Sequence, residues 1–492
     1  MIPVLLIVIP LLTGFLAFFV RDDKTVRWLV LFSSILTLIV SILGLTYFKD
    51  PRYLEHHAPW MSNLGSSFSV KLDGMGQVLC LLTAVSFPII FIATWNSQYK
   101  NAHNFFGLML LTQAGLMGVF VSMDALLFYF FWELALIPVY FLCSQWGGER
   151  RIQVTFKFFI YTFAGSVLML IGILYLYFQT PEQSFDINAF YQLKLPIKEQ
   201  LWVFWLLFIA FAIKMPIFPF HTWQPDTYEQ SPTATTMVLS GIMVKMGVFA
   251  VIRWLLPVLP AASYAWGDMV SIISITGMIY ASLLAMQQDD LKRLVAYSSI
   301  AHIGLMCAAI FGETNIGLQG VMIQMFNHGI NIIGLWIVIE LIERQFGTRK
   351  ISELGGLAQK APTMAVLLVI VALANIALPL TNAFVGEFMM FNGIFGSQVT
   401  KYNILFTVLA GVSIILSAVY TLNMIQKVFY GESSALTANG KDIRFNEKFI
   451  LIILVILILV IGIYPKPILD LTSEITAAIL KQSDVTPLLF RK

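Results

Sequence analysis

Apolar runs of about 20 residues recur from one end of this chain to the other, which is the length that a membrane-crossing helix needs. Of its 492 residues, 58% are hydrophobic and only 12% are charged, and the mean hydropathy is +0.82. Soluble domains carry about 25% charged residues. In lipid the backbone must satisfy its own hydrogen bonds, as α-helices do. The sequence therefore predicts an all-α polytopic membrane protein with residues 1–492 in a single membrane domain.

The apolar runs predict about 14 transmembrane helices. The first follows Met1 without a charged leader or cleavage site, so we expect it to be retained. No connection is long enough for a soluble domain, and neither a GxGxxG nor a P-loop motif is present. Nucleotide or flavin chemistry would therefore belong to other subunits. The expected spans lie near 2–20, 26–47, 77–95, 104–121, 124–143, 154–178, 201–222, 233–256, 267–287, 294–311, 318–342, 363–394, 402–427 and 448–464.

Charge and cysteine content narrow the function further. The net charge of +3 is too small to indicate nucleic-acid binding. Cys80, Cys143 and Cys307 are isolated in apolar spans, so neither a metal cluster nor a redox dithiol is expected. More Lys and Arg residues fall in one set of connections than in the other, which predicts that this set is cytoplasmic and that both termini are external.

Lys214 stands at the end of an apolar run that Pro216 and Pro219 then interrupt. A charge at the bilayer centre costs roughly 2.5 to 3.5 kcal/mol on insertion scales, so such a lysine usually faces a partner or a water-filled cavity. Broken backbone at membrane depth needs the same surroundings. Because charge and helix break coincide at Lys214, the sequence indicates ion handling.

Five further ionisable residues lie inside the spans, with His221 and Asp226 at the edge of the seventh. Glu133 is expected to pair with Lys214, either functionally or as a structural ion pair. Lys245, between Gly241 and Gly247, is expected to be a desolvated proton carrier, with snorkelling as the alternative. His302, His328 and Glu387 complete the set.

The two histidines and Glu387 extend the list into the second half of the chain. Histidine titrates near neutral pH, although a lone buried histidine is more often a hydrogen-bonded core residue. Glu387 lies in a long span with Pro379 near its middle, a second coincidence of charge and break. Broken helices at corresponding positions in two halves indicate an inverted-repeat transporter. We therefore predict a lateral relay of titratable groups, with discontinuous helices seven and twelve.

At these residues the chain resembles the antiporter-like subunits of proton-translocating NADH-quinone oxidoreductase, respiratory complex I, and their relatives in Mrp-type antiporters and membrane-bound hydrogenases. The resemblance covers nearly the whole chain. The stretches that carry it are 131–134 (FWEL), 214–233 (from Lys214 through PFHTWQPD to Pro232-Thr233), 245–247 (KMG), 290–302 (DLKRLVAYSSIAH) and 384–388 (FVGEF). Leu380 departs from the family pattern, which often has glycine beside the helix-twelve proline.

The resemblance implies fourteen helices with two inverted five-helix repeats, at 104–256 and 267–427. It implies that Glu133 and Lys214 form a modulating ion pair, that Lys245 is the central carrier, that His302 and His328 connect the halves, and that Glu387 is the exit-side site. Glutamate at position 387 favours the chain type that carries glutamate, not lysine, on helix twelve. A chain that stops soon after Tyr464-Pro465 favours the type without a long lateral helix.

The resemblance also implies the surroundings of the chain. Quinone reduction elsewhere would drive proton transfer, so the chain would be a non-redox subunit of a translocase in a bacterial inner membrane. We expect it to bind no cofactor, with NADH, FMN, iron-sulfur clusters and quinone in partner subunits. Its partners would be other membrane subunits, including neighbouring antiporter-like ones, and the lipid bilayer. Two alternatives stay open: a Mrp-type cation/proton antiporter subunit, and a passive scaffold whose buried charges only hold helices together.

Overall fold

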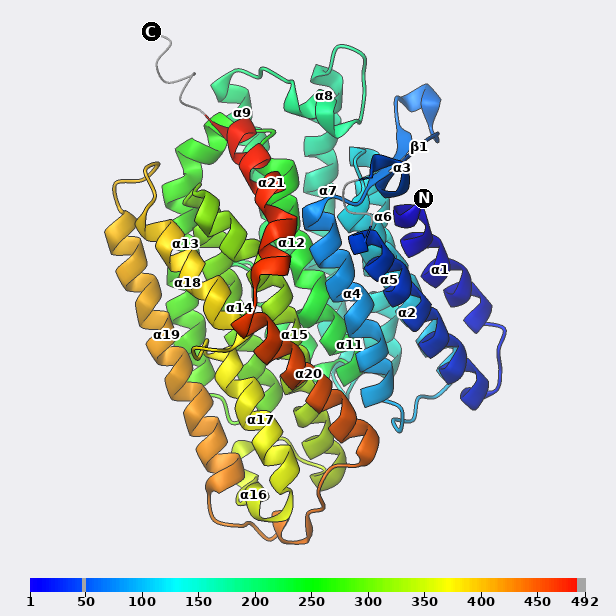
Figure 1. The fold of residues 1–492 in the computed structure, drawn as a ribbon, viewed down its shortest axis with the longest axis vertical. Coiled ribbons are helices and arrows are strands. Elements are labelled where there is room, and N and C mark those ends of the chain that lie inside the picture. The colour runs from blue at the N-terminus through cyan, green and yellow to red at the C-terminus, as the bar shows by residue number, and fades with distance from the viewer. Residues whose placement is uncertain (47–49, 485–492) are drawn as a thin grey trace.

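The computed structural model describes residues 1–46 and 50–484, and nearly all of them lie in a bundle of long helices (Figure 1). Within the described ranges, eleven helices are long and apolar enough to cross a membrane, and α1 and α17 are shorter apolar helices. This confirms the predicted class of helical, multi-pass membrane protein.

The first part of the bundle holds the helices before the first interruption. Asp124 caps α6 through its side chain, which accepts hydrogen bonds from the backbone N–H groups of Leu126 and Leu127 at 3.0 Å. Such a cap satisfies backbone donors that a helix start leaves unpaired. The helices are α1 (Ile2–Ala17), α2 (Asp23–Thr46), α4 (Gly74–Ala93), α5 (Ala102–Val121), α6 (Ala125–Trp146) and α7 (Arg151–Gln179).

The seventh predicted span is interrupted where the prolines stand. Helix α9 (Ile197–Lys214) ends at Lys214, and Pro216 lacks the N–H that the next helical turn would need. The chain then forms a short helix, α10 (Trp223–Gln230). The following segment crosses the bundle as α11 (Thr233–Val238), α12 (Val244–Ala250) and two π-helical turns, η2 (Leu239–Met243) and η3 (Val251–Leu255).

The second part of the bundle contains the other predicted interruption. Helix α17 (Pro362–Asn375) stops before Pro379, and α18 (Asn382–Phe395) continues beyond it. Ala377 and Leu380 in the gap adopt positive φ angles of 56° and 73°, a conformation that costs a non-glycine residue about 1–2 kcal/mol. The remaining helices are α13 (Pro260–Met286), α14 (Leu291–Phe311), α15 (Asn315–Phe346), α19 (Asn403–Ile425), the π-helical turn η5 (Gln426–Tyr430), α20 (Phe445–Ile463) and α21 (Lys466–Ser483).

Short helices and strands lie at both ends of the bundle. On the side predicted to be external, β1 (Glu55–Pro59) and β2 (Ser67–Lys71) form an antiparallel hairpin in which Glu55 is opposite Lys71. The sequence analysis missed this hairpin because its strands are short and polar. Helix α21 was also not predicted; it packs on α4 and α15. The other short elements are α3 (Pro51–Leu54), η1 (Ser62–Leu64), α8 (Ile187–Tyr191), η4 (Ile351–Glu353), α16 (Leu357–Lys360) and η6 (Thr437–Asn439).

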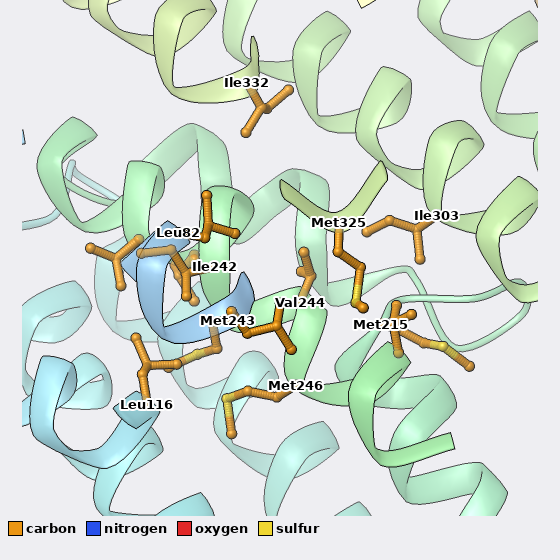
Figure 2. Packing of buried hydrophobic residues seen from close by; sticks show 14 of the residues in the cluster. Leu82, Leu116, Met215, Ile242, Met243, Val244, Met246, Ile303, Met325 and Ile332 are labelled. Carbon is orange, nitrogen blue, oxygen red and sulfur yellow. The ribbon is translucent and has the colours of Figure 1, made fainter. Parts of the chain in front are cut away.

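The interior around α12 is filled by aliphatic and methionine side chains (Figure 2). Methionine is unbranched and fits the irregular space beside broken and π-helical backbone. Gly247 allows α12 to approach the end of α9, since a Cβ atom there would lie 2.6 Å from the carbonyl oxygen of Phe211. The packing therefore holds the Lys245 helix directly against the first interruption. The labelled side chains are Leu82, Leu116, Met215, Ile242, Met243, Val244, Met246, Ile303, Met325 and Ile332.

Candidate proton-transfer site

Lys245 lies at the centre of the bundle, on α12 between the two π-helical turns, and none of its surface is exposed. Its Nζ donates a hydrogen bond to the carbonyl oxygen of Ser240 at 2.7 Å and lies 2.8 Å from Nδ1 of His328 on α15. A π-helical turn leaves carbonyl groups outside the regular i to i−4 pattern and often marks a functional position. The side chain does not reach the surface, so the snorkelling alternative is wrong.

From His328 the polar contacts continue into the second half of the chain. The rings of His328 and His302 are 5.5 Å apart between centroids, and Nδ1 of His302 lies 3.1 Å from Oε1 of Glu387. The Nε2 atoms of both histidines have no hydrogen-bond partner among the described protein atoms. Lys245, His328, His302 and Glu387 thus form one row across α12, α15, α14 and α18. We refer to these four residues as the central row.

Neighbouring amides position the Glu387 end of the row. Gln324 on α15 donates from Nε2 to Oε1 of Glu387 at 3.4 Å. Asn327 donates to the carbonyl oxygen of Asn382, the first residue of α18, at 2.7 Å. The second hydrogen bond ties α15 to the start of the broken helix. Sequence reasoning missed both amides because uncharged polar residues do not stand out when spans are scanned for ionisable groups.

Glu133 and Lys214 do not form the expected contact. Within the described chain, no ion pair joins them at 4.0 Å or less, and neither Nζ of Lys214 nor Oε1 of Glu133 has a hydrogen-bond partner. The Nζ atom instead lies 5.6 Å from the centroid of the Trp132 ring, an arrangement that attracts a cation to the π-face. Lys214 is 2% exposed, whereas Glu133 is half-buried on α6. The two charged groups still interact electrostatically at longer range.

His221 and Asp226, at the edge of the seventh span, lie in different surroundings. His221 is buried against the rings of Phe218 and Tyr280, with centroids 5.7 and 5.4 Å away. Asp226 accepts hydrogen bonds from Lys157 at 2.9 Å and from Arg293 at 3.0 Å. Burial opposes ionisation of Asp226, but the hydrogen bonds from the two cations outweigh it and lower the pKa of the carboxyl group.

Asp226 belongs to a larger ion network on the side predicted to be cytoplasmic. Arg293 at the start of α14 also pairs with Glu229 at 2.9 Å, and Arg349 pairs with Glu229 at 3.3 Å. Arg349 further contacts Asp290 and Glu343. The network therefore ties α10, in the first half, to α14 and the 343–350 segment, in the second. The DLKR stretch beginning at Asp290 supplies Asp290 and Arg293 to this network, but Asp226 and Glu229, more than 60 positions earlier in the chain, could not be inferred as partners of Arg293.

The three cysteines are buried and apart, and no group of three or more His, Cys, Asp or Glu residues in the described ranges could hold a metal ion.

These features define a polytopic membrane protein with a buried row of titratable side chains between two interrupted helices. Residues 122–425 match the family described as "NADH:quinone oxidoreductase/Mrp antiporter, TM". The chain is 36% identical to NADH-quinone oxidoreductase subunit M of Rickettsia conorii, with 92% of both chains covered. It is 33% identical to F(420)H(2) dehydrogenase subunit M of Methanosarcina mazei, with 98% of both covered.

Among solved structures, a chain of respiratory complex I from Thermus thermophilus with bound NADH superposes with a TM-score of 0.91 at 26% identity, covering 98% of this chain and 100% of that one. The chain belongs to the family of NADH:quinone oxidoreductase and Mrp antiporter membrane subunits.

Proposed function

We propose that this chain is the M-type, proton-translocating membrane subunit of a NADH-quinone oxidoreductase, located in a bacterial inner membrane. The observation that carries the proposal is the central row, in which a buried lysine, two histidines and a glutamate connect the two halves of the bundle. The names of the relatives and the glutamate at position 387 support the M type over the types with lysine there.

The chemistry of the row suits stepwise proton transfer. A proton on Nζ of Lys245 can pass to Nδ1 of His328 along the 2.8 Å contact, which is hydrogen-bonding distance. A water-mediated step between the two unpartnered Nε2 atoms would complete the path, and Nδ1 of His302 then faces the Glu387 carboxylate. Glu387 would release the proton on the external side. Lys214 and Glu133 would modulate Lys245 through their charge, because α9 ends against α12 at Gly247.

The finer architecture belongs to the same proposal. Fourteen helices would cross the membrane, with inverted repeats at 104–256 and 267–427 and the interruptions after Lys214 and Asn375 as their corresponding breaks. The chain would carry no redox centre, and NADH, FMN, iron-sulfur clusters and quinone would be bound by partner subunits. Neighbouring antiporter-like subunits would lie beside it in the membrane. Its own part would be to move protons when quinone is reduced elsewhere in the complex.

Proteoliposomes with the purified complex test this function. Addition of NADH and quinone should acidify the lumen in the orientation that exposes the NADH site, and the variant Lys245→Arg should abolish this acidification. A Mrp-type antiporter, the alternative that the family description leaves open, would instead exchange protons when a sodium gradient is imposed without any electron donor. Sodium-driven proton movement and no response to NADH would overturn the proposal.

A further inference from the structure

A wide cavity of about 870 Å³ opens between the β-hairpin, α8 and α21, on the side predicted to be external. Arg253 reaches this cavity from η3, the outer end of the same membrane-crossing segment, Thr233–Leu255, that carries Lys245. The lining carries four carboxylates against the two cations Lys71 and Arg253, so its formal charge is negative and favours cations over anions. These carboxylates are Glu55, Asp73, Asp186 and Glu474.

Arg253 is a permanent positive charge at this boundary, although only 3% of its surface is exposed. Its Nη2 lies 2.5 Å from Oδ2 of Asp73, which caps α4, and the hydroxyl of Tyr191 donates to its backbone carbonyl at 2.9 Å. Its Nε has no hydrogen-bond partner among the described protein atoms. The ion pair with Asp73 therefore holds the guanidinium group, while the hydrogen bond from Tyr191 holds the backbone of η3.

A layer of aromatic rings separates Arg253 from Lys245. The guanidinium carbon lies 5.5 Å from the centroid of the Phe249 ring, one helical turn closer to Lys245. Phe249 in turn packs on Phe120 and Phe128, with ring centroids 5.5 and 6.5 Å away, and all three rings are buried. Arg253 lies eight positions after Lys245, about 12 Å along the helix axis.

We propose that Arg253 and the Phe249 ring layer block the return of protons from the external cavity to Lys245. Arg253 is paired with Asp73, so its guanidinium group occupies the carboxylate at the inner end of the cavity, and apolar constrictions exclude water. Arginine does not deprotonate in proteins, so it cannot relay a proton from the cavity to Lys245. The inference rests on the proposed function, because a block is needed only where Lys245 exchanges protons with the opposite side of the membrane.

Passive proton flux tests the block directly. Vesicles containing the assembled complex, without electron donor, are given a potassium diffusion potential, and the proton flux is followed with a pH dye. We expect Arg253→Gln to raise this flux by on the order of tenfold or more. A tenfold rise corresponds to lowering the free-energy barrier to proton passage by about 1.4 kcal/mol. The matched control is Arg52→Gln. Arg52 is an exposed arginine on the same side of the bundle, and it is not among the residues that line the cavity. A passive proton flux in Arg253→Gln vesicles equal to that of wild type would contradict the proposed block.

The double variant Lys245→Ala, Arg253→Gln identifies the route of the leak. If protons pass through Lys245, the double variant should be as tight as wild type; a leak that persists there would run elsewhere and would also overturn the proposal. Different results contradict the two proposals. Full pumping by Lys245→Arg would contradict the proposed function. Vesicles with Arg253→Gln that pump normally with NADH and show no added proton leak would contradict only the proposed block.

Thiol labelling gives a second test that does not depend on assembly of the arginine variant. A membrane-impermeant methanethiosulfonate added from outside should label Ala478→Cys on the cavity wall and should not label Val244→Cys beside Lys245. Native Cys80, Cys143 and Cys307 are buried, so the background should be low. An unlabelled Ala478→Cys would show that the cavity is closed in the complex, and labelled Val244→Cys would show that no block exists. Either result contradicts the proposal.

Discussion

Nζ of Lys245 lies 2.8 Å from Nδ1 of His328, so the lysine from the first half of the chain directly contacts a histidine from the second. A fixed ion pair would need an opposite charge at this place, whereas histidine offers a lone pair that can take a proton. The contact is the basis of the first prediction, whose outcome distinguishes a proton carrier from a structural cation.

We expect Lys245→Arg to abolish proton pumping almost as completely as Lys245→Ala does. A guanidinium group stays protonated under all relevant conditions and has no proton to give to His328. NADH-driven acidification of inverted vesicles, with assembly checked by native gel, measures the effect. The matched control is Lys292→Arg, a buried lysine paired with Glu343 at 2.7 Å, where arginine can keep the ion pair and pumping should remain. Full pumping by Lys245→Arg would refute the carrier role.

Glu387→Gln should block pumping while leaving the second interruption intact. The amide keeps the size of the side chain and can still contact His302 and Gln324, but it removes the titratable group at the end of the row. Pumping should fall by on the order of 10²-fold, within the range that a positioned acid or base contributes. Glu340→Gln, on the same helix as His328 and outside the central row, serves as the control. Equal pumping in both variants would exclude Glu387 from proton transfer.

Lys214→Ala should strongly reduce pumping in an assembled complex. Because Nζ has no hydrogen-bond partner within the described part of the chain and packs on Trp132, its removal breaks no polar contact there and acts mainly through the lost charge. A scaffold role for Lys214 predicts misassembly instead. Pumping assays together with the yield of assembled complex separate the two outcomes, and an assembled variant with normal pumping contradicts the modulating role.

Glu133→Gln should reduce pumping more than Glu133→Asp, which keeps the charge on a shorter side chain. Since Glu133 and Lys214 are not in direct contact, the double variant Glu133→Gln, Lys214→Ala should show weaker coupling than the 0.5–3 kcal/mol typical of residues that touch. Pumping rates of the four members of this cycle give the coupling. Indistinguishable and active Gln and Asp variants would mean that charge at position 133 has no effect.

Leu380→Gly should raise the stability of the isolated complex without changing its pumping. Leu380 has φ = 73° and an exposed side chain, so glycine removes backbone strain and loses little packing. The expected gain is about 1 kcal/mol. Thermal unfolding in detergent measures it, with Leu378→Gly, which lacks a positive φ, as the control that should lower stability. A lower melting temperature for Leu380→Gly would show that the leucine side chain outweighs the strain.

Much of the fold follows from the sequence because each membrane helix must bury an apolar run of defined length. The interruptions after Lys214 and Asn375 were predicted from Pro216 and Pro379, which remove backbone donors. The hairpin and α21 were not predicted. Their stability depends on packing against the bundle, as for α21 on α4 and α15, and local sequence does not contain that information.

For the candidate site, the sequence likewise predicted the residues but not the contacts between them. Scanning for buried charges found all four members of the central row, because ionisable residues are rare in apolar spans. It did not find the contacts between them, since the order Lys245, His328, His302, Glu387 depends on how α12, α15, α14 and α18 pack. The expected Glu133–Lys214 contact was wrong for a related reason: sequence gives the helix of each residue but not the direction in which its side chain points.

The spacing of the central row has a consequence for spectroscopy. Groups joined at 2.8 and 3.1 Å, with two imidazole rings 5.5 Å apart between them, influence the charge of one another strongly. Hydrogen-bonded groups in a continuous row polarise one another, so a change at one member alters the others. Infrared difference spectra of the Glu387 carboxyl should therefore shift when His328 is replaced, although the two side chains come from different helices, and a change at any one position should be visible at the other three.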